Sequence, residues 1–239
     1  MTDRREMDQV TEVEALKARL GELEQRLNEA SGAYGGVTLC AVTKTVPADT
    51  VNAAIEAGVR LIGENRVQEL VDKLPLLKGD VQAHLIGRLQ TNKVKYLPGR
   101  VSLIQSLDRI ELARAIDRAA QSAGIVMDAL IQVNIGREPQ KGGVDEDQLD
   151  ELIRACDPLE GLRVRGLMAV MPQADDPEQV RPLMRRMRRL FDARRARPVG
   201  RADMEILSMG MSHDCFVAAE EGATMVRVGT ALFGQRPAR

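Results

Sequence analysis

Lys44 is the side chain of this sequence best placed for covalent chemistry. It ends the apolar run 37–43 and shortly precedes Pro47. A β-rich run followed by proline near a helix start predicts a strand that feeds a helix, and α/β folds keep their ligand sites at such strand ends. Burial among apolar neighbours disfavours a lysine's ammonium and leaves a free amine, which forms Schiff bases with aldehydes. Taken alone, Lys44 also fits a solvated lysine at a strand end, because lysines are mostly exposed.

Two segments in the last thirty residues have the composition of a phosphate site. The first, 210–212 (GMS), leads into a predicted helix whose N-terminal amides favour an anion. The second, Gly229 and Thr230, combines a close backbone approach with a hydroxyl. Ser212 also fits an ordinary helix N-cap, and Gly229 an ordinary turn glycine. Neither segment matches G-x-G-x-x-G or the Walker pattern, so the sequence does not indicate a dinucleotide or ATP site.

An amine and a phosphate cradle on one rim suit a phosphorylated aldehyde, for which pyridoxal 5′-phosphate is the obvious candidate. Arg227 lies just before the cradle and can donate a hydrogen bond to a pyridine nitrogen, because guanidinium does not accept. A ring nitrogen that faces arginine stays unprotonated and withdraws electrons less well than a protonated one. The alternative for Arg227 is a surface or salt-bridged arginine.

Composition bounds the class of protein. The 239 residues, 44% hydrophobic, suffice for one large core, and 34 basic against 35 acidic residues give a net charge of -1. Such a chain has no global field for nucleic acid or an anionic membrane. Three separated cysteines without C-x-x-C argue against disulfides and structural zinc, and two histidines are too few for a His-rich metal site, so we expect no metal. With neither a signal-peptide core nor roughly 18 consecutive apolar residues, the expected location is cytoplasmic.

The pattern of elements predicts an α/β fold, a single (β/α)8 TIM-like barrel with an extra N-terminal helix. Residues 8–30 carry apolar positions at three-four spacing, which predicts a helix that docks on the protein's own core rather than a coiled coil. We therefore divide the chain into 1–36, helix and connector, and 37–239, the barrel. An open doubly wound sheet is the main rival. The predicted strands are 37–43, 59–62, 82–86, 101–104, 127–133, 162–168, 204–207 and 225–228, and helices are predicted at 47–57, 108–123, 177–195 and 212–221.

Polar residues collect where these strands end, and in a barrel the carboxyl ends of the strands build the site. Asn65 follows the second strand, and His84 lies within the third. The other such residues are Lys44, Gln105, Ser106, Asn134, Ser208 and Arg227.

Five segments resemble the pyridoxal phosphate homeostasis proteins, also called proline synthase co-transcribed homologues. The resemblance runs from Val37 to Gly234, with the motifs in the family's order. The segments are 41–44 (AVTK), 62–69 (IGENRVQE), 84–93 (HLIGRLQTNK), 207–212 (LSMGMS) and 226–230 (VRVGT).

The resemblance implies the barrel of the alanine racemase N-terminal domain, a pyridoxal 5′-phosphate cofactor held as an internal aldimine, and a role in vitamin B6 and amino-acid homeostasis. It implies that Lys44 forms the aldimine and that Arg227 faces the pyridine nitrogen. Asn65 and His84 would line the ring, and the phosphate contacts would come from Ser208, Ser212, Gly229 and Thr230.

The chain departs from the family pattern at two places. It has 212–214 (SHD) where the family often has Ser-Asp-Asp, and 133–138 (VNIGRE) where the family often reads Val-Asn-Ile-Ser-Gly-Glu. Neither departure removes an implied cofactor contact.

The expected function is a carrier of pyridoxal phosphate rather than an enzyme, and we expect a monomer. PLP-requiring apo-enzymes are candidate recipients, and neither nucleic acid nor a membrane is an expected partner. An amino-acid racemase is the first alternative, but it needs a second acid/base on the opposite face, and neither Tyr34 nor Tyr96 lies at a strand end. A Schiff-base aldolase is the second. Nucleic-acid binding by the arginine-rich stretch 181–191 is the third, although its apolar residues fit a core-docked helix.

Overall fold

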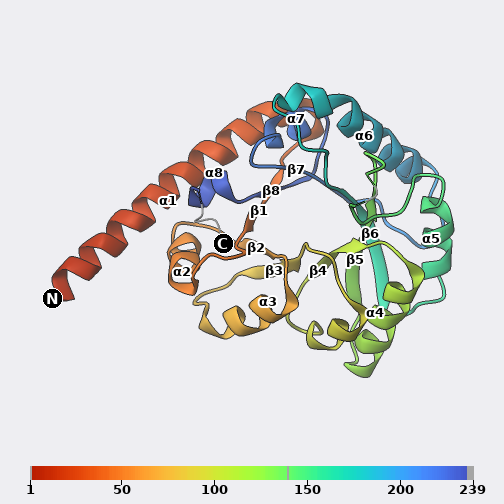
Figure 1. The fold of residues 1–239 in the computed structure, drawn as a ribbon, viewed down its shortest axis with the longest axis horizontal. Coiled ribbons are helices and arrows are strands. Elements are labelled where there is room, and N and C mark those ends of the chain that lie inside the picture. The colour runs from red at the N-terminus through yellow and green to blue at the C-terminus, as the bar shows by residue number, and fades with distance from the viewer. Residues whose placement is uncertain (1, 139, 236–239) are drawn as a thin grey trace.

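The sheet is a closed barrel of eight parallel strands in chain order, shown in a computed structural model that describes residues 2–138 and 140–235. Strand β1 pairs with β8, so the sheet has no free edge, and the helices surround the ring of strands (Figure 1). The TIM-like barrel predicted from the alternation is confirmed, and the open-sheet alternative is wrong. The strands are β1 Thr38–Val42, β2 Leu61–Glu64, β3 Gln82–Leu85, β4 Leu103–Leu107, β5 Met127–Val133, β6 Leu162–Ala169, β7 Ile206–Met211 and β8 Met225–Val228.

Helices follow the strands because apolar residues recur at helical spacing between them. In α4, Leu112, Ile116 and Ala120 lie buried on one face, and the helix ends before Gly124, whose φ of 67° suits glycine alone. The α-helices are α1 Thr2–Ser31, α2 Ala48–Glu56, α3 Val67–Lys73, α4 Ile110–Ser122, α5 Leu149–Cys156, α6 Arg181–Ala196, α7 Cys215–Glu220 and α8 Thr230–Phe233, and the 3-10 helices are η1 Gly32–Tyr34, η2 Leu74–Leu76, η3 Thr91–Tyr96 and η4 Pro177–Val180.

Helix α1 docks on the barrel, as its apolar stripe predicts. Its buried leucines belong to the same hydrophobic core as the residues between strands and helices. It contacts α2, α7 and α8, while its N-terminal part projects beyond the barrel (Figure 1). The buried residues of this stripe are Val13, Leu16, Leu20, Leu23 and Leu27.

The barrel interior has an apolar floor and a polar layer nearer the carboxyl ends of the strands. Side chains alternate along each strand, so every second residue points inward. Two residues beyond the floor residue Leu103 comes Gln105, and two beyond Met225 comes Arg227; both polar residues are buried. The small hydrophobic clusters that contain Leu103 and Met225 also include Cys40, Leu61, Leu130 and Met168, with Ile86, Val170 and Ile206 packed against them.

Several element boundaries differ from those predicted. Strand β4 includes Gln105 and Ser106, which were expected after it, because a barrel buries polar side chains inside its strands. Strand β7 runs on to Met211, and α7 begins at Cys215 rather than Ser212. None of the described helices has the length and apolar character needed to span a membrane, and no cluster of potential metal ligands occurs among the described residues.

Candidate functional site

Lys44 lies in the turn that follows β1, at the mouth of the barrel. The parallel pairing of β1 with β2 continues through the hydrogen bond from the Thr43 amide to the Gly63 carbonyl, 3.0 Å long. Thr43 donates its hydroxyl to Glu64, and Lys44 follows as the first residue of the turn. The expected burial among apolar neighbours is wrong, because Lys44 is exposed in the turn, beyond the last buried residues of the strand.

A chain of hydrogen bonds crosses the barrel interior from β8 to β3. The Arg227 guanidinium donates to Ser208 Oγ at 2.6 Å, and Ser208 donates to Gln105 Oε1 at 2.7 Å. Gln105 Nε2 lies 2.9 Å from His84 Nδ1. The chain brings His84, Ser208 and Arg227, three of the predicted site residues, into one network.

The direction of this chain follows from the chemistry of Arg227. A guanidinium donates but never accepts, so the Ser208 oxygen accepts from it and its proton goes to Gln105. The Gln105 oxygen is therefore the acceptor, its amide nitrogen donates to His84, and Nδ1 of His84 must accept. The neutral His84 ring consequently carries its proton on Nε2.

Burial controls the charges inside the barrel. Desolvation lowers the pKa of His84 to about 4, so the imidazole is neutral near pH 7. Desolvation also lowers the pKa of Arg227 to about 10, and raises the pKa of the Cys40 thiol to about 12. Among the described residues, Arg227 has no carboxylate in a salt bridge; its other terminal nitrogen donates to the Ala169 carbonyl at 2.8 Å. It is a buried cation suited to a neutral acceptor or an anion.

Ser212 joins the two segments of the predicted phosphate cradle. Its hydroxyl oxygen accepts from the amides of Gly229 at 3.0 Å and Ala231 at 3.2 Å. The N-cap alternative for Ser212 is wrong, because Asp214 stands at the start of α7 and accepts from the Met211 amide. Two backbone amides thus converge on one oxygen atom beside the exposed Thr230.

The cradle and the polar chain are separate groups of residues. Ser208, implied by resemblance to contact phosphate, is buried and uses its hydroxyl between Arg227 and Gln105. Asn65 lies half-buried just after β2, where its backbone closely approaches the turn after β3. A Cβ on Gly87 would lie 2.2 Å from the Asn65 carbonyl oxygen, so only glycine fits there.

The sequence predicts no role for Gln105 beyond its place at a strand end, because its hydrogen-bond partners come from three other strands. The sequence likewise predicts no role for Glu64, Glu69 and Lys73, which hydrogen-bond to the turn that carries Lys44. The motif 62–69 was the only signal that could have drawn attention to Glu64 and Glu69.

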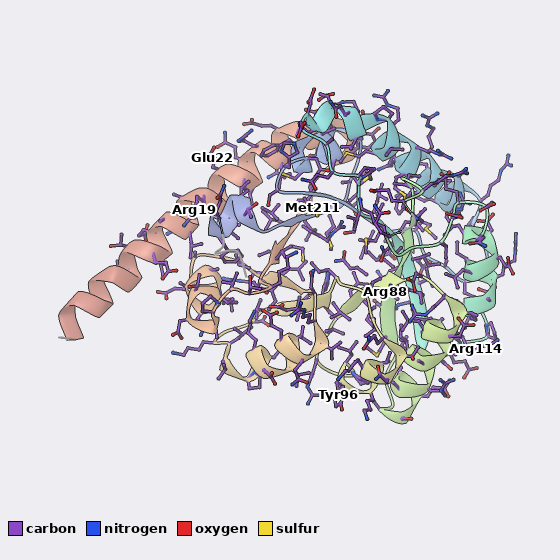
Figure 2. The ribbon with its side chains drawn as sticks, viewed as in Figure 1. Arg19, Glu22, Arg88, Tyr96, Arg114 and Met211 are labelled. Carbon is purple, nitrogen blue, oxygen red and sulfur yellow. The ribbon has the colours of Figure 1, made fainter. Side chains whose placement is uncertain are left out.

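The two tyrosines weighed for the racemase alternative lie outside the strands of the barrel. Tyr34 precedes β1 and stacks with Arg188, and Tyr96 in η3 lies within cation–π range of Lys93 and Lys95. Tyr96 lies at the outer edge of the view, whereas Met211, at the end of β7, lies toward its middle (Figure 2).

Helix α6 packs its apolar face on the core and pairs many of its arginines with acidic side chains. Met184, Met187 and Phe191 are buried, which confirms the core-docked interpretation of this stretch. The paired arginines are Arg181, Arg185, Arg186, Arg188 and Arg194.

Comparison with known proteins identifies relatives over almost the whole chain. The profile of the alanine racemase N-terminal domain matches residues 14–237. The pyridoxal phosphate homeostasis protein of Aquifex aeolicus is 46% identical over 224 residues, which cover 91% of this chain and 97% of the relative. PipY of Synechococcus elongatus, solved with PLP bound, superposes with a TM-score of 0.81 at 34% identity, covering 92% of this chain and 100% of PipY.

The alanine racemase of Corynebacterium glutamicum shares the fold, with a TM-score of 0.71 at 16% identity. The match covers 95% of this chain but 62% of the racemase.

Proposed function

The chain belongs to the pyridoxal phosphate homeostasis proteins of the alanine racemase N-terminal domain family, and on this premise we propose that it binds pyridoxal 5′-phosphate through a Schiff base with Lys44. The observation that carries the proposal is the placement of an exposed amine, a hydroxyl-and-amide cradle and a buried guanidinium at one end of one barrel. A relative of similar length binds the same compound, because PipY was solved with PLP.

The donor set fits this cofactor. The amides of Gly229 and Ala231 already converge on an oxygen, which is the arrangement a phosphate oxygen requires. Arg227, held by Ser208 and the Ala169 carbonyl, offers a fixed donor suited to a pyridine nitrogen. Asn65, just after β2, and His84, in β3, would line the ring.

The cofactor, when bound, supplies an aldehyde that condenses reversibly with amines. Lys44 would supply the amine for this condensation, in which the carbonyl oxygen would be lost as water. Arg227, a fixed cation, would face the ring nitrogen, favour its unprotonated form and so moderate the electron-withdrawing power of the ring.

We assign the protein to reversible holding of pyridoxal phosphate in vitamin B6 and amino-acid homeostasis. Racemisation needs a second proton donor and acceptor opposite Lys44. Both tyrosines of the chain lie elsewhere, Tyr34 ahead of β1 and Tyr96 in η3. Reversible holding of the cofactor, unlike racemisation, requires no second acid/base opposite Lys44.

The test is covalent trapping. Purified protein is mixed with pyridoxal 5′-phosphate, its visible spectrum is recorded, and borohydride reduction is followed by peptide mapping. We expect a yellow species whose reduced adduct maps to Lys44, is lost in Lys44→Ala, and persists in Lys78→Ala, which removes an exposed lysine elsewhere. An adduct on another lysine, or none, would refute the proposal, and turnover of D- or L-alanine by the pure protein would restore the racemase alternative.

A further inference from the structure

The turn that carries Lys44 has a strained backbone. Thr45 has φ of 61°, in the left-handed region that β-branched residues rarely adopt. Strain of this kind persists only where the surrounding structure imposes it, and it concentrates at functional sites.

The side chains of Glu64, Glu69 and Lys73 hydrogen-bond to the turn on both sides of Lys44. Glu69 accepts a hydrogen bond from the Thr45 amide at 2.5 Å. Lys73 donates to the Thr43 carbonyl at 2.7 Å, and Glu64 accepts from the Thr43 hydroxyl at 2.7 Å. The backbone groups nearest to Lys44 in the chain, one before it and one after it, are therefore both fixed.

The same three side chains also bind one another. Lys73 Nζ lies 2.6 Å from Glu64 Oε1 and 3.1 Å from Glu69 Oε1. With the Thr43 carbonyl as third acceptor, all three ammonium donors of Lys73 are used. Glu64 and Lys73 are both buried, and within the described part of the chain the second carboxylate oxygen of Glu64 has no hydrogen-bond partner.

A buried ion pair is a poor source of stability, because desolvation of the two charges offsets much of their attraction. Such a group fixes geometry instead, and here the geometry it fixes is that of the Lys44 turn. Residues of β2 and α3, far from Lys44 in sequence, thus determine where its side chain begins.

We propose that Glu64, Glu69 and Lys73 are positioning residues for Lys44 and that this clamp, through the strained turn at Thr45, sets how fast Lys44 captures an aldehyde. The inference rests on the proposed function, because the capture step assumes that Lys44 is the reacting amine. The clamp touches no cofactor itself; it acts on the backbone on either side of Lys44. A mobile turn would spread the amine over many directions and lower its effective concentration at the mouth.

The first readout needs no cofactor. Amide hydrogen exchange at Thr45 is measured in the wild type, in Glu69→Ala and in Val71→Ala, a control that trims a half-buried α3 residue outside the clamp. Loss of a charge-assisted hydrogen bond is expected to speed native-state exchange at Thr45 by about 10-fold to 100-fold in Glu69→Ala. Val71→Ala is expected to exchange like the wild type there.

The second readout is the rate of pyridoxal 5′-phosphate capture, followed by stopped-flow absorbance with the unfolding temperature measured alongside. Glu69→Ala and Lys73→Met are expected to slow capture at least about tenfold, and Glu69→Gln, which keeps an acceptor oxygen, to recover part of the rate. Val71→Ala should lose stability without losing rate.

The two possible failures are distinguishable. Unchanged exchange at Thr45 and an unchanged capture rate in folded Glu69→Ala would overturn the clamp while leaving the proposed function intact. Absence of capture by the wild type would overturn the proposed function. If Lys73→Met does not fold, Glu69→Ala decides, because Glu69 is only partly buried.

Discussion

His84 offers the sharpest physical test of the barrel interior. The residue is 5% exposed, and burial lowers its pKa from 6.5 to about 4. At a pH between about 4 and 6.5, His84 is largely protonated in the unfolded chain and largely neutral in the folded protein. The contribution of His84 to stability is therefore fully present above pH 6.5 and is lost as the pH falls toward 4.

The magnitude follows from the shift. One pKa unit corresponds to about 1.4 kcal/mol, so the full contribution is about 3 kcal/mol, of which about 2 kcal/mol is lost by pH 5. His84→Gln removes this titration. The wild type should therefore lose about 2 kcal/mol more than the variant between pH 7.5 and pH 5.

The assay is urea unfolding of both proteins at pH 7.5, 6 and 5, combined with an NMR titration of the two histidines. His213 is exposed and provides the comparison resonance. A parallel loss of stability in both proteins, or titration of His84 near 6.5, would refute the reasoning. Nitrogen chemical shifts that place the His84 proton on Nδ1 would separately refute the direction of the hydrogen-bond chain from Arg227.

Three further perturbations address the fold, the turn and the cradle. Leu16→Ala should cost about 2–5 kcal/mol in chemical unfolding, because Leu16 is buried where α1 meets the core; a cost below about 1 kcal/mol would mean that α1 docks weakly. Thr45→Gly should raise stability by up to about 1 kcal/mol, since relief of left-handed strain exceeds the entropy cost of glycine, and a clear loss would contradict the strain. Ser212→Ala removes a hydroxyl that would donate to the phosphate and that also accepts from the amides of Gly229 and Ala231, so it should weaken pyridoxal phosphate binding about tenfold in a fluorescence titration; an unchanged Kd would remove Ser212 from the cradle.

The fold was accessible from sequence because each strand and helix has its own local pattern. Strands β5 and β8 begin and end where their β-branched and apolar residues predict. The prediction for β4 ended too early, since polar residues such as Gln105 normally mark the surface, whereas closure of the barrel buries them. The burial of Gln105 depends on strands that are distant in the sequence, so the residues next to it do not predict that burial.

The candidate site was only partly accessible for the same reason. Lys44 and Gly229 could be selected because each follows a recognisable strand. The links among site residues could not, because Ser208 and Gln105 meet across 103 positions of sequence. Likewise Thr45 has a left-handed backbone and donates its amide to Glu69, and nothing in the residue type threonine predicts either.

The pairing of β1 with β8 gives the barrel a seam that closes late in protein synthesis. A growing chain displays β1 on the ribosome long before residues 225–228 exist, and until then β1 has an open edge, which is a template for aggregation. Helix α1 precedes β1 and packs on α7 and α8, so its final partners also emerge last. The buried Arg227 lies on β8, the strand that closes the seam. Closure of the sheet and completion of its polar interior therefore depend on the same strand, so a nascent chain that ends before β8 lacks both the closed barrel and the full candidate site.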